Sequence, residues 1–494
     1  MCTICALSSL PRCPNRTSVM SSDLDDRRPI GLTLGQRLDR VRWSPRHVTI
    51  LVGLGAGWLF DSLEVNLVGN FINPLDKHFH ASATAGQFVI FSWLVGILIG
   101  ALVGGRLADR FGRRRMFVAT LVWYAGFTVL TGFSPTLSVV VALRFITGLG
   151  VGAEYPIINA AISELMPARV RGKASAAVMN FWSIGAILAG LLAFLLLNAV
   201  ALSDGVSWRY GFALGGILAV VVVFFRRRLP ESPRWLASQG RQDEAEAIVA
   251  QLEVAAGIGN GEEAGFAAEQ ATLTFGQALS ELVHRYPGRL ALGAALDLSE
   301  AFGYYGIFAF LPLVVFPAIG IANSQIPFFY IFGNVGALVG GVGMTLLFDK
   351  LGRARTVITF YVLAALGVGL LAVATNTANS TLVLVAFMVS SGFATAAWTS
   401  AYPTFTELFP THLRGAGVGA SVAVGRIGAA FGVTLVTTVA MHTNITAGYL
   451  IVVAFWMVGV AAMVMYALRG GVEAARRPLE SLVTPKGRPD PALA

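Results

Sequence analysis

The chain contains the same set of motifs twice, about 240 residues apart. The corresponding segments are Leu32–Gln36 with Leu273–Gln277, Asp61–Glu64 with Asp297–Glu300, Asp109–Arg113 with Asp349–Arg353, and Glu164–Gly172 with Glu407–Gly415. A repeat of this length indicates two homologous halves. A functional site is then expected where the halves meet.

Both halves are too apolar for a protein that folds in water. Hydrophobic residues make up 55% of the chain and charged residues 13%, against roughly 25% charged residues in a soluble domain. We predict an all-α integral membrane protein with twelve spans of about 20 apolar residues each. They form two pseudo-symmetric six-helix bundles, 47–226 and 289–468, with a tail at 1–46, a linker at 227–288 and a second tail at 469–494. The twelve spans are expected to begin near residues 48, 86, 116, 137, 174, 208, 290, 325, 356, 380, 416 and 445.

The formal net charge of +9 sets the topology of the chain and does not indicate a nucleic-acid partner. Of the 36 Lys and Arg residues, all but Lys77, Arg144, Arg209 and Arg426 fall in the two tails and the even-numbered loops. Positive residues favour the cytoplasmic side of a membrane. Both termini and the linker are therefore expected in the cytoplasm, and the protein in the plasma membrane, or in the inner membrane if it is bacterial.

The amino-terminal tail is expected to hold no metal and no cofactor. All three cysteines, Cys2, Cys5 and Cys13, lie there, and no second cysteine pair or histidine cluster completes a metal site. We expect no cleavable signal peptide before the first span, and Met20 is an alternative start.

Short amphipathic segments flank the two bundles. Leu34, Leu38 and Val41 share one face of a helix whose other face is charged, which predicts a helix lying on the membrane surface. The linker contains a further surface helix, Gln242 to Glu253. The alternative is that these helices are simple spacers. The copy of the first segment, before the seventh span, carries Phe275, Leu279, Leu282 and Val283.

A short charged loop at 105–114 joins the second and third spans. It resembles the signature loop of the major facilitator superfamily, whose acidic and arginine groups pair with neighbouring helix ends in the outward-open state and release on reorientation. The alternative is that its arginines only fix the topology. The gating positions that the resemblance implies are Gly105, Asp109, Arg110, Gly112 and Arg113, with Asp349 and Arg353 in a degraded second copy.

Two further strings resemble the sugar-porter branch of that superfamily and its relatives, which include organic-ion and metabolite carriers. The first is Arg144 followed by Gly148, Gly150 and Gly152. These glycines lie in an apolar helix, where small residues allow close helix packing, and do not form a nucleotide-binding turn. The second is the string at 230–236, in which Glu231 and Arg234 take gating roles by resemblance.

Acid and arginine pairs bracket two equivalent turns, Glu164 with Arg171 and Glu407 with Arg414. In the resembled family such charges form salt bridges between the halves when the inner gate is shut. Exposed pairs contribute only about 0–1 kcal/mol each, so they bias a gate without locking it. Helix capping is the alternative role.

Ionisable residues inside the expected spans are the candidates for proton coupling, because a charge in a membrane costs several kcal/mol unless it is paired or hydrated. Asp61 and Glu64 share one helix face. Burial favours a neutral carboxyl and a nearby arginine favours the charged form. Alternating contact with Arg144 is therefore expected to make Asp61 bind and release a proton. In the resembled proton-linked carriers, a first-span acid and the fourth-span arginine have these roles. A static buried ion pair is the alternative.

Three more acids extend this set. Asp297 and Glu300 repeat the first-span pair in the second half. Glu154 lies on the expected helix of Arg144 and belongs to a string, Glu154-Tyr155-Pro156, that resembles a functional stretch of phosphate:proton symporters. Since the residues that follow depart from that signature, phosphate is not the expected substrate. Glu154 remains a candidate second proton site.

Arg426, in the eleventh span, is the second cation expected inside the membrane, after Arg144. In the organic-ion carriers that this region resembles, the position tends to be Arg in anion carriers and acidic in cation carriers. A guanidinium holds a carboxylate bidentately. The other candidate substrate-binding residues, each alternatively a packing residue, are Asn180, Trp182, Tyr304, Tyr305, Asn334 and Trp398.

The sequence therefore predicts a secondary carrier that moves a small organic anion, an aromatic or heterocyclic monocarboxylate, together with protons. Alternatives are a proton-coupled sugar or polyol symporter, an exporter by proton antiport, and a sensor that retains the fold. The second half is poor in the Gln and Asn residues that sugar carriers use, which favours the anion. An enzyme is not expected, because the chain lacks a P-loop and a His-Glu-x-x-His motif. We expect a monomer whose partners are the substrate, protons and the lipid bilayer.

Overall fold

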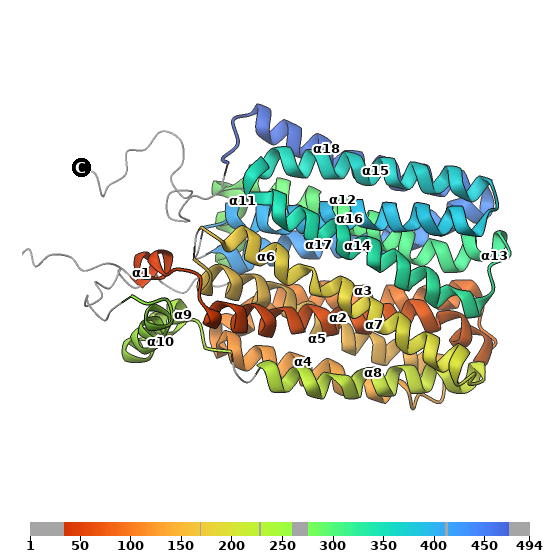
Figure 1. Cartoon of the computed structure of the whole chain (residues 1–494), viewed down its shortest axis with the longest axis horizontal. Coiled ribbons are helices and arrows are strands. Elements are labelled where there is room, and N and C mark those ends of the chain that lie inside the picture. The colour runs from red at the N-terminus through yellow and green to blue at the C-terminus, as the bar shows by residue number, and fades with distance from the viewer. Residues whose placement is uncertain (1–33, 168, 227–228, 259–274, 411–412, 474–494) are drawn as a thin grey trace, which may run out of the picture.

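The computed structural model describes residues 34–167, 169–226, 229–258, 275–410 and 413–473. Within these ranges the regular structure is helical, and no strand occurs. The three cysteines, Met20 and the Leu32 and Leu273 ends of the first repeat lie outside them. Figure 1 shows the long helices running side by side, with the first half below and the second half above.

Six spans form each half, and each begins within a few residues of its predicted start. The first half consists of α2 (Pro45–His78), α3 (Ala83–Phe111), α4 (Arg113–Thr131), α5 (Leu137–Leu165), α6 (Arg171–Met179) continued by α7 (Phe181–Phe194) and a π-helical segment (Leu195–Ala199), and α8 (Asp204–Arg226). The second half consists of α12 (Pro287–Phe310) continued by a π-helical segment (Leu311–Val315) and α13 (Phe316–Ala318), α14 (Ile326–Leu351), α15 (Arg353–Asn376), α16 (Ser380–Leu408), α17 (Arg414–His442) and α18 (Ile445–Leu468).

Ten of these spans are long and apolar enough to cross a membrane by length and composition alone. The other two, α4 and α8, carry charged residues at their ends, among them three arginines at the start of α4. Helix α4 packs against α5, α8 packs against α2, and α4 and α8 pack against each other inside the first half. Ten apolar spans with α4 and α8 therefore make the predicted twelve-helix membrane fold.

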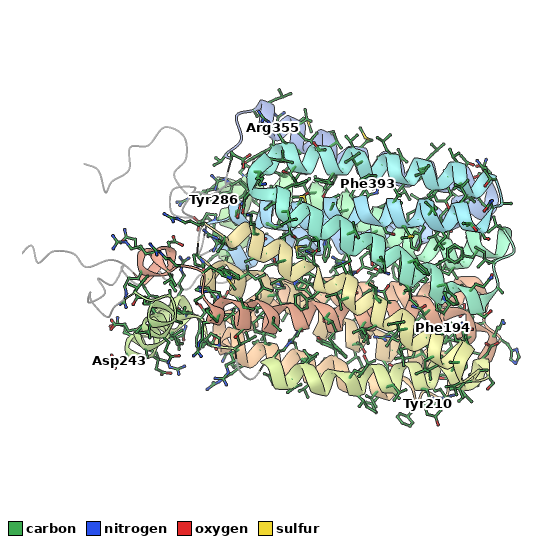
Figure 2. All side chains as sticks on the ribbon, viewed as in Figure 1. Phe194, Tyr210, Asp243, Tyr286, Arg355 and Phe393 are labelled. Atoms are coloured by element: carbon green, nitrogen blue, oxygen red, sulfur yellow. The ribbon has the colours of Figure 1, made fainter. Side chains whose placement is uncertain are left out.

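The outward side of the bundle is apolar. Large hydrophobic side chains stand exposed along several spans, such as Ile217 on α8, Val339 on α14 and Leu366 on α15. In Figure 2 such side chains fringe the long helices, while Asp243 lies on the separate helices at one end. A surface of this kind suits contact with lipid.

Glycines set the closest helix contacts, as the sequence predicted for the fourth span. A Cβ atom at Gly148 would meet the backbone carbonyl of Trp93, and one at Gly152 would meet that of Ile97. Gly150 faces the rings of α4 instead. Helices α3 and α5 are thus packed backbone to backbone, an approach that small residues permit.

Three short helices lie together at one end of the bundle, called here the linker end (Figure 1). They are α1 (Leu34–Arg40), α9 (Pro233–Ser238) and α10 (Gln242–Ala255), while α11 (Phe275–Arg285) precedes α12. Arg37 of α1 donates to both carboxylate oxygens of Glu253 at 2.9 and 2.6 Å.

The prediction that α1 lies with its apolar face on the membrane is wrong. Leu34, Leu38 and Val41 are buried, with exposed fractions of 9%, 4% and 4%, and α1 contacts α9 and α10. The apolar face is therefore covered by protein. In α11, Leu282 is also buried, whereas Val283 is exposed.

Candidate substrate and proton sites

Glu64 and Arg144 form a fully buried ion pair in the middle of the first half. Glu64 comes from α2 and Arg144 from α5, and neither side chain is exposed. The Thr128 hydroxyl of α4 donates to Glu64 Oε1 at 3.1 Å. The Arg144 guanidinium lies 5.2 Å from the ring centre of Phe212 on α8. The sequence predicted Asp61 as the partner of Arg144, and in this conformation the partner is the acid one turn further along the helix.

A second buried ion pair, Glu154 with Arg226, was not predicted. Arg226 donates to both carboxylate oxygens of Glu154 and, at 2.8 Å, to the Phe117 carbonyl. The Tyr124 hydroxyl donates to the same carboxylate at 3.1 Å. Gly57 of α2 makes room for the pair, because a Cβ there would collide with both side chains. Arg226 ends α8 and is followed by two more arginines, so in the sequence it resembles a charge at the membrane surface.

Asp61 is buried without a cation of its own. It is 1% exposed, and neither of its carboxylate oxygens has a hydrogen-bond donor among the described residues. It lies beside Tyr124 and Glu154, whose interactions are directed to each other and to Arg226. Of the three acids Asp61, Glu64 and Glu154, two are thus paired with a buried arginine, and Asp61 is the acid left over.

The second half brings Asp297 and Glu300 of α12 near Arg426 of α17. All three are buried, with exposed fractions of 0%, 3% and 2%. Arg426 Nη2 donates to the Tyr402 hydroxyl at 3.2 Å. In the part of the chain that the structure describes, Arg426 Nε and Nη1 have no acceptor and the oxygens of Asp297 have no donor. The arginine therefore offers two unused N–H groups inside the protein.

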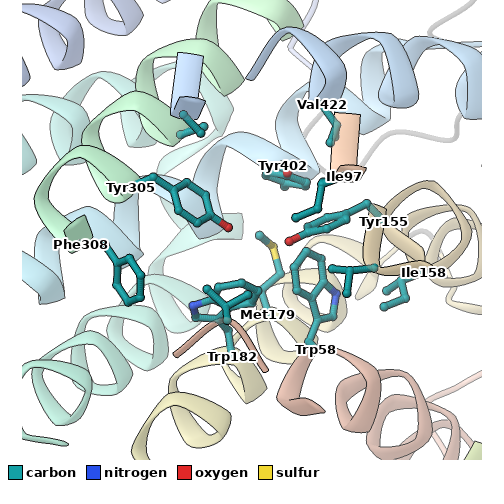
Figure 3. Close-up of a cluster of buried hydrophobic side chains, with 14 of the residues drawn as sticks. Trp58, Ile97, Tyr155, Ile158, Met179, Trp182, Tyr305, Phe308, Tyr402 and Val422 are labelled. Carbon is teal, nitrogen blue, oxygen red and sulfur yellow. The ribbon is translucent and has the colours of Figure 1, made fainter. Parts of the chain in front are cut away.

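Aromatic rings from both halves surround this arginine. The Arg426 guanidinium lies 5.1 Å from the ring centre of Tyr155 and 5.2 Å from that of Tyr305, one from each half. In Figure 3 the hydroxyls of Tyr155 and Tyr305 point toward each other across the centre of the cluster, with Tyr402 and Trp58 beside them. Such rings stabilise a cation held over their faces.

The ring cluster continues across the interface of the halves. Trp58 lies edge-on to Tyr155, Trp182 and Trp398, with ring centres 4.9, 5.8 and 5.3 Å away. Trp182 Nε1 donates to the Tyr304 hydroxyl at 3.0 Å. The structure therefore brings together four predicted residues, Trp182, Tyr304, Tyr305 and Trp398. It adds three that the sequence reasoning missed, Trp58, Tyr155 and Tyr402.

One signal in the sequence pointed to two of the missed residues. Trp58 lies three residues before Asp61, and Tyr155 directly follows Glu154. Each shares a helix with an intramembrane acid. The two predicted asparagines have other contacts: Asn180 donates to Thr345 across the halves at 2.9 Å, and Asn334 donates to the Tyr330 carbonyl of its own helix at 2.8 Å.

Two matching charge clusters lie at the linker end. Arg113 contacts Asp109 at 2.7 Å and Glu164 at 3.2 Å. Arg353 repeats this in the second half, with Asp349 and Glu407 both at 2.9 Å. The preceding residues Gly112 and Gly352 have φ angles of +93° and +82°, a conformation that favours glycine.

Each cluster contains a further carboxylate, which accepts hydrogen bonds from the first backbone N–H groups of α4 or of α15. Glu231 accepts from the Arg113 N–H at 2.9 Å, and Glu473 accepts from the Arg353 N–H at 3.0 Å. Anions are favourable at this position because of the unpaired N–H groups and the helix dipole. Glu473 was missed, since its surroundings do not repeat the string around Glu231. Of the other predicted gating residues, Arg234 lies half-buried on α9.

The two halves touch at both ends. At the linker end Arg414 donates to the Ser163 hydroxyl at 3.3 Å, and Arg171 and Glu407 line a small cavity beside this contact. At the opposite end Gln87 donates to Thr437 at 3.0 Å. Other predicted gating residues pack near the first contact or at the surface. Gly105 faces Gly415 of the second half, and Arg110 lies 5.3 Å from the ring centre of Phe111.

Comparison with known proteins agrees with this architecture. The chain is 30% identical to the niacin transporter NiaP of Acinetobacter baylyi over 80% of its own length and 88% of that protein. It is 26% identical to a putative niacin/nicotinamide transporter of Bacillus subtilis, over 78% and 87% of the two chains. The structure of the proton:xylose symporter XylE superposes with a TM-score of 0.72 at 22% identity, over 88% of this chain and 98% of that one. The last likeness concerns the fold alone.

The family assignment follows from a further match. The sequence profile of the Major Facilitator Superfamily fits residues 54–433 and 290–487, which together cover most of the chain. The protein is therefore a multi-pass membrane transporter, not an enzyme, and belongs to the major facilitator superfamily.

Proposed function

We propose that this transporter carries a small organic anion, an aromatic or heterocyclic monocarboxylate of the size of nicotinic acid, together with protons. The observation that carries the proposal is Arg426, which has two unused N–H groups within a cluster of aromatic rings. The names of the two niacin relatives support the same class of substrate.

The chemistry of the cluster suits such a ligand. A guanidinium holds a carboxylate through two parallel hydrogen bonds, and its planar fork selects this shape. Trp58, Trp182 and Trp398 provide apolar faces and edges for a flat ring, at the interface where the two halves meet. A ring with one carboxylate satisfies both sets of groups together.

Proton coupling in the first half is assigned to Asp61. Glu64 and Glu154 each have an arginine, whereas Asp61 is buried without one. A buried carboxylate without a partner is costly, so a proton on Asp61 stabilises this conformation. Access to water after reorientation would let Asp61 release that proton.

Reorientation would open one end of the bundle while the other stays closed. The proposed cytoplasmic gate consists of the two charge clusters and the contact between Arg414 and Ser163. The linker end then faces the cytoplasm, with both termini, in the plasma membrane or the inner membrane of a bacterium. We propose a monomer, because each chain contains both halves of the site.

Replacing Asp61 with asparagine is expected to lower strongly the accumulation of the substrate against its gradient. Asparagine resembles a permanently protonated acid, so the halves still reorient but no proton is released at this position. Exchange of labelled for unlabelled substrate should remain partly intact. Both rates are measured in proteoliposomes with an imposed pH gradient. Accumulation by the Asp61→Asn variant at the wild-type level would exclude Asp61 as the coupling group.

The substrate class is tested with the same vesicles. Labelled nicotinic acid, benzoic acid, a hexose, a polyol and an organic cation are compared with and without a pH gradient, acid outside. The proposal expects gradient-driven uptake of the two acids only. Uptake of the hexose or polyol in their place would establish the sugar alternative, and acid-driven efflux would establish proton antiport.

A further inference from the structure

The buried acids Asp297 and Glu300 outnumber the arginine beside them, Arg426. If all three side chains are ionised, their net charge is not zero. Asp297 and Glu300 lie one turn apart on α12. Helix α17 packs closely against α12 there, because a Cβ at Gly425, the residue before Arg426, would meet the Asp297 carboxylate. Two ionised acids and one arginine leave one negative charge in excess. A buried charge without compensation is unfavourable, so the empty site is most stable with one acid protonated and one ionised.

The other groups facing this pair do not change that balance. Tyr402 of α16 already accepts a hydrogen bond from Arg426. Tyr361 of α15 donates to the Leu296 carbonyl at 3.1 Å. Helix α18 contains no charged residue in its sequence. The remaining titratable neighbours, Tyr304 and Tyr305, belong to α12 itself.

A substrate carboxylate at Arg426 changes the balance. The bound anion then compensates the arginine, and the acid that was ionised becomes the unpaired charge. It also repels the anion. The loaded site is therefore most stable with both acids protonated, and binding of one anion draws in one proton.

The first half has no such link to the substrate. Glu64 and Glu154 keep their own arginines, and Asp61 shares neither Arg426 nor a hydrogen bond with the residues around it. Adding an anion at Arg426 leaves the number of acids and arginines in that half unchanged. Asp61 therefore responds to reorientation, whereas the second-half pair responds to binding.

We propose that Asp297 and Glu300 form a second proton site, which takes up one proton whenever an organic anion binds Arg426. This inference rests on the proposed function. It places the proton that enters with the substrate beside the substrate itself, separate from the proton on Asp61. The loaded carrier would then carry two protons with one anion, in addition to the proton that the second-half pair keeps throughout, and one net positive charge would cross the membrane in each cycle.

The test measures proton uptake on binding, without transport. Purified protein in detergent and weak buffer is titrated with nicotinic acid while an indicator dye reports pH. We expect about one proton per bound anion, and none with nicotinamide, which is neutral. Above the range where the acids titrate, the affinity for nicotinic acid should fall about tenfold for each pH unit.

The variants separate the two proton sites. The double variant Asp297→Asn with Glu300→Gln should bind nicotinic acid without proton uptake and with an affinity that no longer depends on pH. Either single variant should retain the uptake, because one remaining acid suffices. Asp61→Asn is the matched control and should retain it fully. Nicotinamide binding shows which variants are folded.

The outcomes distinguish this inference from the proposed function. Loss of uptake in Asp61→Asn, or persistence of uptake in the double variant, would overturn the inference and leave the transport of anions intact. Binding of nicotinic acid by the wild-type protein without any proton uptake would do the same. Failure to bind any acid of the panel would overturn both. If the double variant does not fold, the proton uptake of Asp61→Asn decides the inference. Retained uptake supports a proton site separate from Asp61, and lost uptake overturns it.

Discussion

Replacing Arg426 with alanine is expected to weaken binding of nicotinic acid by about 100-fold or more. The substitution removes two charge-assisted hydrogen bonds to the substrate carboxylate, each contributing about 1.5–3 kcal/mol. Nicotinamide has the same ring but no charge, so its affinity should fall by about tenfold at most. Equilibrium binding to purified protein measures both values under one set of conditions.

Two further variants control this result. Arg426→Lys keeps the charge but loses the planar fork, so its affinity for nicotinic acid should lie between those of the wild type and of the alanine variant. Arg209 donates to the carbonyls of Gly132 and Ser134 outside the ring cluster, and Arg209→Ala should leave both affinities unchanged. Equal losses for acid and amide in Arg426→Ala would contradict the assignment of an anionic substrate.

Replacing Arg226 with methionine is expected to lower the free energy of unfolding by about 3–5 kcal/mol. The substitution leaves Glu154 buried, with the Tyr124 hydroxyl as a remaining donor and no compensating charge. Thermal unfolding in detergent, followed by tryptophan fluorescence, measures the loss. Glu154→Gln should cost less, because Arg226 keeps the Phe117 carbonyl as an acceptor.

A double variant shows whether charge or packing causes the loss. Arg226→Met combined with Glu154→Met removes both charges and should recover most of the stability, because a buried ion pair is often no better than apolar residues of similar volume. The exposed pair Arg241 and Glu244, 2.7 Å apart on the surface, is the matched control. Arg241→Ala should leave the unfolding temperature unchanged. A double variant as unstable as Arg226→Met would show that the guanidinium acts through its shape.

The sequence was sufficient for the fold, because membrane helices are read from apolar length and the two halves repeat the same motifs. Individual positions at the linker end followed as well. Arg113 and Arg353 lie in equivalent strings, and the structure places both in equivalent ion pairs. Contacts made within one helical turn or one loop can be predicted from the sequence, because the residues involved are close together in it.

Partners from distant helices were harder to predict. Arg144 had Asp61 and Glu64 within one turn of each other as candidates, and only helix packing decides between them. Arg226 lies at the end of an apolar run and before two more arginines, which is the pattern of a charge at the membrane surface. Leu34 and its neighbours on α1 have the pattern of a membrane-surface helix, but the same pattern also suits a helix packed on α10.

The carboxylates of Glu231 and Glu473 tie the chain that leaves the sixth span of each half to the beginning of the third. Within each half, a carboxylate thereby holds two helix ends together on this side of the bundle. We expect the third and sixth spans of a half to keep their relative position when the halves reorient, so that the motion takes place between the halves and not within them.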